Sequence, residues 1–123
     1  MSRDLFFFLF RAVIILSFLG SVRFALADIS GEWNLSLNVQ SQSGSAVASI
    51  RQHNEDIEGT YIGQRFGTVD FTGTMVDGEL DFQLELDAGL IIYEGRTQDD
   101  GSIKGTADLA GMAVASFVAV KAD

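Results

Sequence analysis

An alternation of apolar and polar residues with a period of two dominates the chain after Asp28. The stretch WNLSLNV at 33–39 places an apolar side chain at every second position, and so does ELDFQLELD at 79–87. Successive side chains of a strand point to opposite faces, so both stretches predict strands with one buried face, as in an antiparallel sheet. No segment after Asp28 shows a convincing helical repeat.

Turn-forming residues divide this region at short, even intervals. The predicted turns lie at 41–44, 54–56, 64–67, 77–78, 87–89, 99–101 and 110–111. Glycine tolerates the positive φ of tight hairpins, so Asp77-Gly78 and Asp100-Gly101 are the best hairpin turns. The strands are therefore expected near residues 31–40, 45–53, 57–64, 68–76, 79–87, 90–98, 102–109 and 112–121.

Eight consecutive hairpin-linked strands, each with one apolar face, predict an all-β protein. The expected architecture is an eight-stranded antiparallel up-and-down (meander) barrel, because closure removes the edge strands that would pair with other chains. Glycines recur inside the strands, as in IEGTYIG at 57–63 and IKGTA at 103–107. A strand glycine marks a bend, a bulge or a close backbone approach, and we interpret Gly59, Gly73, Gly95 and Gly105 as repeated corners of a small barrel.

The sequence leaves open whether this barrel holds a cavity. Eight strands enclose a space just wide enough for side chains or for one small ligand. The candidates for the interior include both bulky and small residues. The bulky ones are Trp33, Phe71, Phe82 and Tyr93, and the small ones are Ala46, Ala48, Gly73, Gly105, Ala107, Ala113 and Ala115. If the small residues face inward they leave room, and if they face outward the core is solid.

Residues 1–27 have the composition of a secretory signal peptide, expected as an N-terminal helix cleaved after Ala27. Arg3 and Arg11 form a basic start, an apolar run covers residues 12–19, and Ala25-Leu26-Ala27 supplies the small residues of a cleavage site. The alternative is an uncleaved membrane anchor, since residues 5–26 are long enough to span a bilayer. Cleavage would leave residues 28–123, which is 123 − 27 = 96 residues, as one periplasmic or secreted domain without cysteine.

The charge balance excludes some partners. The chain has a formal charge of −9, and residues 1–27 contribute three arginines and one aspartate, so residues 28–123 carry −9 − 2 = −11. Such a surface repels nucleic acid and anionic lipid. We therefore expect no nucleic-acid partner, no membrane association after cleavage, and a monomer.

Two short motifs resemble known families. The sequence SGEW at 30–33, followed by IEGTYIG and short strands with internal glycine, resembles the small avidin-like or lipocalin-like β-barrels of secreted bacterial proteins. In these families a Gly-x-Trp near the start of the first strand closes the barrel base, which implies that role for Trp33. The GTY motif aligns Tyr61 with a ligand-binding tyrosine, but Trp33 is the only tryptophan, so biotin is not the expected ligand. GEWNLSL at 31–37 is also similar to bacterial barrel inhibitors of secreted metalloproteases.

No set of residues predicts catalysis, a metal site or a cofactor. His53 is the only histidine, which excludes a histidine-rich metal site and a convincing catalytic triad. Glu79, Asp81 and Glu85 alternate with apolar residues and are expected on a solvated strand face. We therefore expect a protein that is not an enzyme.

The segment 64–67 is the best candidate for recognition, because loops on a rigid scaffold often carry function. Arg65 and Phe66 place a cation and an aromatic ring in one turn, where they could form a ligand mouth. Alternatively, Phe66 plugs the barrel end and Arg65 pairs with an acid. The candidate ligand-binding residues are Trp33, Tyr61, Arg65, Phe66, Phe82, Tyr93 and Arg96.

Two functions are consistent with these patterns. The first is a secreted or periplasmic, non-enzymatic barrel that binds a small hydrophobic ligand. The alternative is a solid barrel that acts as a protein-binding or protease-inhibitor-like module through its loops.

Overall fold

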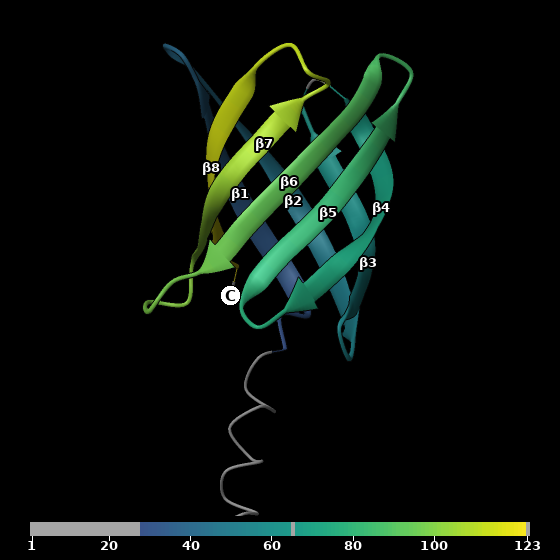
Figure 1. Ribbon diagram of the computed structural model, residues 1–123, viewed down its shortest axis with the longest axis vertical. Helices are drawn as coiled ribbons and strands as arrows, with labels where there is room; N and C mark the ends of the chain where they lie inside the picture. Colours follow the sequence, from purple (N-terminus) through teal and green to yellow (C-terminus); the bar gives the residue numbers. More distant parts are fainter. Residues whose placement is uncertain (1–27, 65, 123) are drawn as a thin grey trace, which may run out of the picture.

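The computed structural model describes residues 28–64 and 66–122. They form eight antiparallel strands joined by turns. The strands are β1 (Gly31–Val39), β2 (Gln42–His53), β3 (Asp56–Gly63), β4 (Gly67–Val76), β5 (Glu79–Leu86), β6 (Gly89–Thr97), β7 (Ile103–Leu109) and β8 (Val114–Lys121). Each strand pairs with the next, and β1 pairs with β8, which closes the barrel (Figure 1). The predicted all-β up-and-down barrel is confirmed. The predicted signal helix and its cleavage site lie outside the described residues.

Two predicted strand starts are wrong. The second strand begins at Gln42 rather than near residue 45, because the alternation of β1 continues to Val39 and its backbone pairs with Gln42 and Gly44. The eighth strand begins at Val114 rather than near residue 112. The hairpin at Asp77-Gly78 joins β4 to β5 with φ values of 51° and 81°, the two positive angles that a type I′ turn requires.

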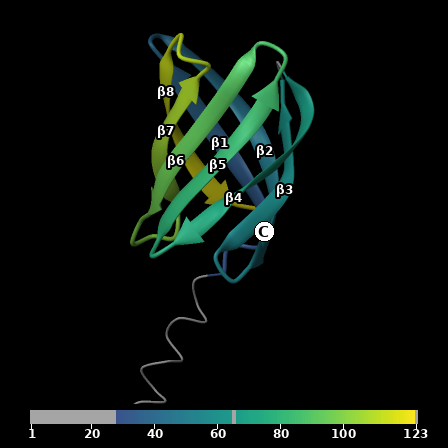
Figure 2. The same ribbon diagram turned by 45° about the vertical axis from the view of Figure 1, so that its right-hand side comes forward.

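The strand directions divide the connecting turns between two ends of the barrel (Figures 1 and 2). We call the end with the β1–β2, β3–β4, β5–β6 and β7–β8 turns the mouth, and the end with the other turns the base. Residues 28–30 cross the base, where Ile29 is buried. The indole Nε1 of Trp33 donates a hydrogen bond of 2.9 Å to the Ile29 carbonyl. This hydrogen bond holds residues 28–30, which precede β1, against the interior of the barrel.

A layer of aromatic rings fills the middle of the barrel. Phe82 stacks on Tyr93 with ring centroids 4.6 Å apart and an interplanar angle of 5°. Phe71 packs against the other side of Phe82 at 4.5 Å, and Phe117 meets Tyr93 edge-on at 5.1 Å. Offset-stacked and edge-to-face pairs add to the free energy gained by burial alone. The rings therefore occupy the interior that small inward residues would otherwise leave empty.

The small residues whose direction the sequence left open do face inward. Ala46, Ala48, Ala107 and Ala115 are all buried in the core. The glycines inside strands have the same direction and lie where other atoms leave no room for a Cβ. At Gly59, Gly73 and Gly105 an added Cβ atom would collide with a backbone carbonyl oxygen of the neighbouring strand, and at Gly59 it would also lie 2.9 Å from Cζ of Phe71. At Gly95 the nearest atom is Cζ of Phe117, at 2.8 Å. These glycines thus mark close approaches to the backbone, one of the three readings that a strand glycine allows.

Candidate functional site

The mouth of the barrel contains a cavity of about 240 Å³. Its walls come from β1, β2, β3, β7 and β8 and from the β3–β4 turn. The lining residues are Leu37, Val39, Gln42, Ser43, Gly44, Ser45, Tyr61, Gly63, Gln64, Phe66, Leu109 and Ala115. This volume exceeds the roughly 150 Å³ of a cavity that holds benzene and falls below the roughly 300 Å³ at which pockets for drug-sized ligands begin. The cavity therefore fits one small molecule.

Missing side chains create this space. Gly44 lies opposite Leu37 in the β1–β2 register, and a Cβ atom there would meet no atom within 4 Å. Gly63 lies two residues after Tyr61, and a Cβ atom at Gly63 would lie 3.0 Å from Cε1 of the Tyr61 ring. The Tyr61 ring therefore leans along β3 toward the mouth. Phe66 stands on the rim with 41% of its surface exposed.

Tyr61 also marks the deep end of the cavity, where it meets Tyr93. The two phenol oxygens lie 2.6 Å apart, and the ring centroids are 5.7 Å apart. Both side chains are buried, and Tyr93 is held between Phe82 and Phe117 in the aromatic layer. The position of the Tyr61 hydroxyl is thus fixed by a partner whose own ring cannot easily move.

Either phenol can donate the hydrogen bond of this pair. Burial raises the pKa of the Tyr93 phenol far above its ordinary value, and the charge and the hydrogen bond of Tyr61 raise it further. Burial also raises the pKa of Tyr61, but the hydrogen bond with Tyr93 offsets part of that rise. Both phenols therefore stay protonated near neutral pH, whichever of them donates.

One phenol proton then remains without an acceptor. Two phenols carry two protons, and a single hydrogen bond between them uses one. Within residues 28–64 and 66–122, Tyr61 and Tyr93 form no other side-chain hydrogen bond. Tyr61 lines the cavity, so a hydrogen-bond acceptor there would favour the arrangement in which Tyr93 donates to Tyr61 and the Tyr61 O–H is free.

The structure separates the residues that the sequence grouped as ligand candidates. Tyr61 and Phe66 line the cavity, and Tyr93 supports Tyr61 from behind. Phe82 belongs to the aromatic layer, and Trp33 packs at the base. Arg96 ends β6 on the base side and pairs with Glu79 on the outer surface at 2.6 Å. Arg65 lies outside the described residues.

Several lining residues escaped the sequence analysis. Leu37 and Val39 carried a signal, since the alternation of 33–39 predicts them on the buried face of their strand. Ser43, Gly44 and Ser45 were assigned in part to a turn and in part to a strand, so their side of the sheet was undefined. Only their pairing with β1 places Gly44 across from Leu37.

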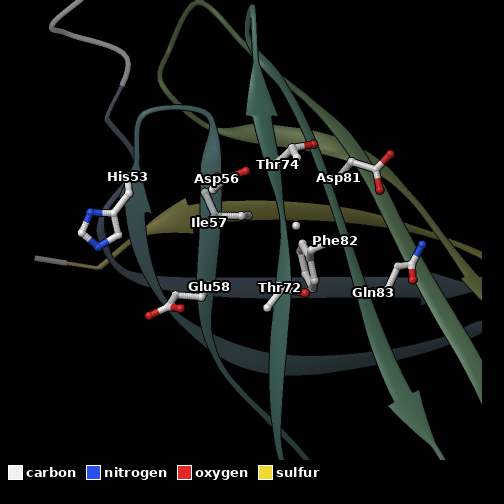
Figure 3. Close-up of a pocket in the computed structure, with 10 residues that line it drawn as sticks. His53, Asp56, Ile57, Glu58, Thr72, Thr74, Asp81, Phe82 and Gln83 are labelled. Carbon is white, nitrogen blue, oxygen red and sulfur yellow. The ribbon is translucent and has the colours of Figure 1, made fainter.

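Two other depressions lie on the described residues, and neither is lined by a buried polar side chain with a free hydrogen-bond donor. One lies on the outside of β3, β4 and β5, where Glu58, Thr72 and Asp81 point to solvent while Phe82 points inward (Figure 3). His53 is exposed at its edge. The other lies at the base, where the Trp33 N–H is bonded to Ile29 and the Asp100 carboxylate to Ser102. No group of three or more metal-binding side chains occurs among the described residues.

Comparisons with protein-family models and with curated proteins find no match to the chain. The barrel is consistent with the avidin-like or lipocalin-like fold that the motifs suggested, and the family itself stays a prediction.

Proposed function

We propose that the protein binds a small, mainly apolar molecule in the mouth cavity, with a hydrogen-bond acceptor of that molecule placed at the Tyr61 hydroxyl. The observation that carries the proposal is that the Tyr61 phenol lines a cavity with mainly apolar walls and belongs to a pair of hydroxyls whose single mutual hydrogen bond uses one of their two protons. Ligand sites in proteins commonly combine mainly apolar walls with a few fixed polar groups. A carbonyl, ether or carboxylate oxygen would complete the hydrogen bonding of the tyrosine pair.

The chemistry of the cavity favours binding without catalysis. Its walls supply the Tyr61 phenol, side-chain amides and aliphatic groups, and the raised pKa of Tyr61 keeps the phenol protonated near neutral pH, where it is a poor base. A signal peptide of the kind that residues 1–27 suggest would deliver the protein to the periplasm or the exterior. There it would act as a carrier or scavenger of its ligand.

The alternative of a protein-binding module has one observation in its favour. Met112, in the β7–β8 turn beside the mouth, is 80% exposed. An exposed apolar side chain on a loop is a common anchor for a partner protein. If this function is correct, Met112→Ser will abolish capture of a defined partner and leave small-molecule binding unchanged.

A matched pair of probes tests the cavity function. Acetophenone and α-methylstyrene have nearly the same shape, but only the ketone accepts a hydrogen bond. We expect both to shift the amide signals of Gly63 and Ala115 in NMR titrations of protein purified after expression of the full-length chain. Tyr61→Phe should weaken acetophenone binding about fivefold, because one neutral hydrogen bond is worth about 1 kcal/mol. Binding of α-methylstyrene should stay unchanged.

Tyr93→Phe is the matched control. It removes the other hydroxyl of the same hydrogen bond but leaves the Tyr61 O–H in the cavity, so the preference for the ketone should persist. If neither probe binds the wild-type protein, the mouth cavity is not a binding site for molecules of this size. If both bind and Tyr61→Phe affects them equally, the cavity is a site but Tyr61 is not its polar contact.

A further inference from the structure

Among residues 28–64 and 66–122, one part of the outer surface of the barrel carries no charged side chain. It consists of the outward positions of β8, those of β1 after Glu32, those of β2 before Arg51, and the end of β3, on strands that are neighbours in the closed sheet (Figures 1 and 2). We call it the neutral face. Its residues are Asn34, Ser36, Asn38, Ser43, Ser45, Val47, Ser49, Ile62, Val114, Ser116, Val118 and Val120.

The rest of the outer surface is different. The outward positions of β4 to β7 include many charges: Asp70, Glu79, Asp81, Glu85, Glu94, Arg96, Lys104 and Asp108. In a chain with 17 acidic and 8 basic residues, an uncharged surface that extends over β8 and over parts of β1 and β2 is a departure from the general composition. Solubility explains the acidic surface but does not explain why this face lacks acids.

Strand register arranges the neutral face in rows. Asn34 pairs with Val120 on one side and with Val47 on the other, and Val47 pairs with Ile62. Val120 and Ile62, at the two ends of this row, are 54% and 51% exposed. A shallow depression between them is lined by Asn34, Ser45 and Ile62. This row therefore consists of one amide side chain and three apolar side chains.

We propose that the neutral face is the docking surface for a second copy of this chain, in a two-fold symmetric dimer. A two-fold interface brings the same patch together from both copies, so the patch must complement itself. Asn and Ser carry both donors and acceptors and meet this condition, whereas carboxylates accept hydrogen bonds only and repel their own copies. Two molecules with this net negative charge meet with least repulsion when their charged faces point away from each other.

The size of the face sets the strength of the dimer. Four strands about 4.8 Å apart, with about five residues each, span roughly 20 Å by 17 Å. This is the scale of a transient interface rather than an obligate one, so the dimer should dissociate at micromolar concentrations. Salt should strengthen it, because ions screen the repulsion between the two acidic molecules. The composition predicts a monomer, whereas the neutral face predicts monomers that associate at high protein concentration. The dependence of molecular size on concentration distinguishes the two.

Sedimentation velocity on protein purified after expression of the full-length chain tests the proposal. The concentration should run from about 10 µM to about 1 mM, in about 20 mM and about 500 mM NaCl. We expect a dimer fraction that rises with concentration and is larger at high salt. Ile62→Glu should reduce that fraction at least tenfold, because it places a carboxylate of each copy in the interface.

Met112→Glu is the matched control, since it adds the same charge at an exposed apolar side chain in a turn outside the neutral face. Its dimer fraction should equal that of the wild type. The proposal is overturned if no dimer forms at either salt concentration, or if salt dissociates the dimer. It is also overturned if the two variants behave alike, or if the neutral face proves to bind a different protein while the purified chain stays monomeric.

Discussion

Tyr61 and Tyr93 join two strands that are not neighbours, β3 and β6, through one hydrogen bond of 2.6 Å inside the barrel. The bond ties the floor of the mouth cavity to the aromatic layer, where Tyr93 stacks on Phe82. It also leaves one of the two phenol protons available to a ligand. The stability of the barrel and the chemistry of the cavity therefore depend on the same pair.

The energetic coupling of this pair can be measured in a double-mutant cycle. Tyr61→Phe and Tyr93→Phe should each lower the free energy of unfolding by about 1 to 2 kcal/mol, because each leaves a buried hydroxyl unpaired. The double variant should lose less than the sum, with a coupling free energy of about 1 kcal/mol. Urea denaturation of the four proteins gives these values. Strict additivity would mean that the two hydroxyls do not interact in solution.

Alkaline titration offers a second, independent readout. The chain has two tyrosines, so absorbance near 295 nm reports on this pair alone. Both folded pKa values lie above the value of an exposed phenol, so the stabilisation is complete below a pH of about 10 and is lost as pH rises through the folded pKa values. We expect phenolate to appear only well above that pH, together with unfolding. A reversible transition centred near pH 10 in folded protein would contradict the burial of the pair.

Two glycines of β2 and β3 should respond differently to the same substitution. Gly59→Ala places a Cβ against the Phe71 ring and the β2 backbone, so it should destabilise the protein by roughly 2 kcal/mol or more. Gly44→Ala adds a methyl group that meets nothing within 4 Å, and should change stability by about 0.5 kcal/mol at most. Thermal unfolding followed by circular dichroism compares them. Equal losses would mean that neither the β2 backbone nor the Phe71 ring approaches Gly59 closely in solution.

Filling the mouth cavity should separate binding from folding. Gly44→Leu introduces a side chain opposite Leu37 and reduces the volume of the mouth cavity, which is about 240 Å³ in the wild type. We expect acetophenone affinity to fall at least tenfold while the melting temperature changes by a few degrees at most. The NMR titration used for Tyr61→Phe measures the affinity. If the affinity for acetophenone is unchanged and the amide signals of other residues shift, the ligand binds elsewhere on the barrel.

Part of the site could have been predicted from strand directions alone. The predicted group of aromatic and cationic residues included Trp33 and Arg96, which the structure places at the base and on the outer surface. Counting strand directions from the first strand would have placed both on the base side, because Trp33 lies near the start of β1 and Arg96 lies near the end of β6. The same count puts Tyr61 and Phe66 toward the mouth, where they line the cavity.

The sequence by itself determined the number and order of the strands, and the buried faces of β1 and β5, because alternation and turn residues are local properties of the chain. Tertiary structure alone decided where the interior is filled and where it is empty. Gly59 and Gly44 are both glycines on inward positions, yet a ring from a neighbouring strand occupies the space beside one, and the other borders the cavity. That difference depends on the register between strands and on the reach of each side chain, which no single strand encodes.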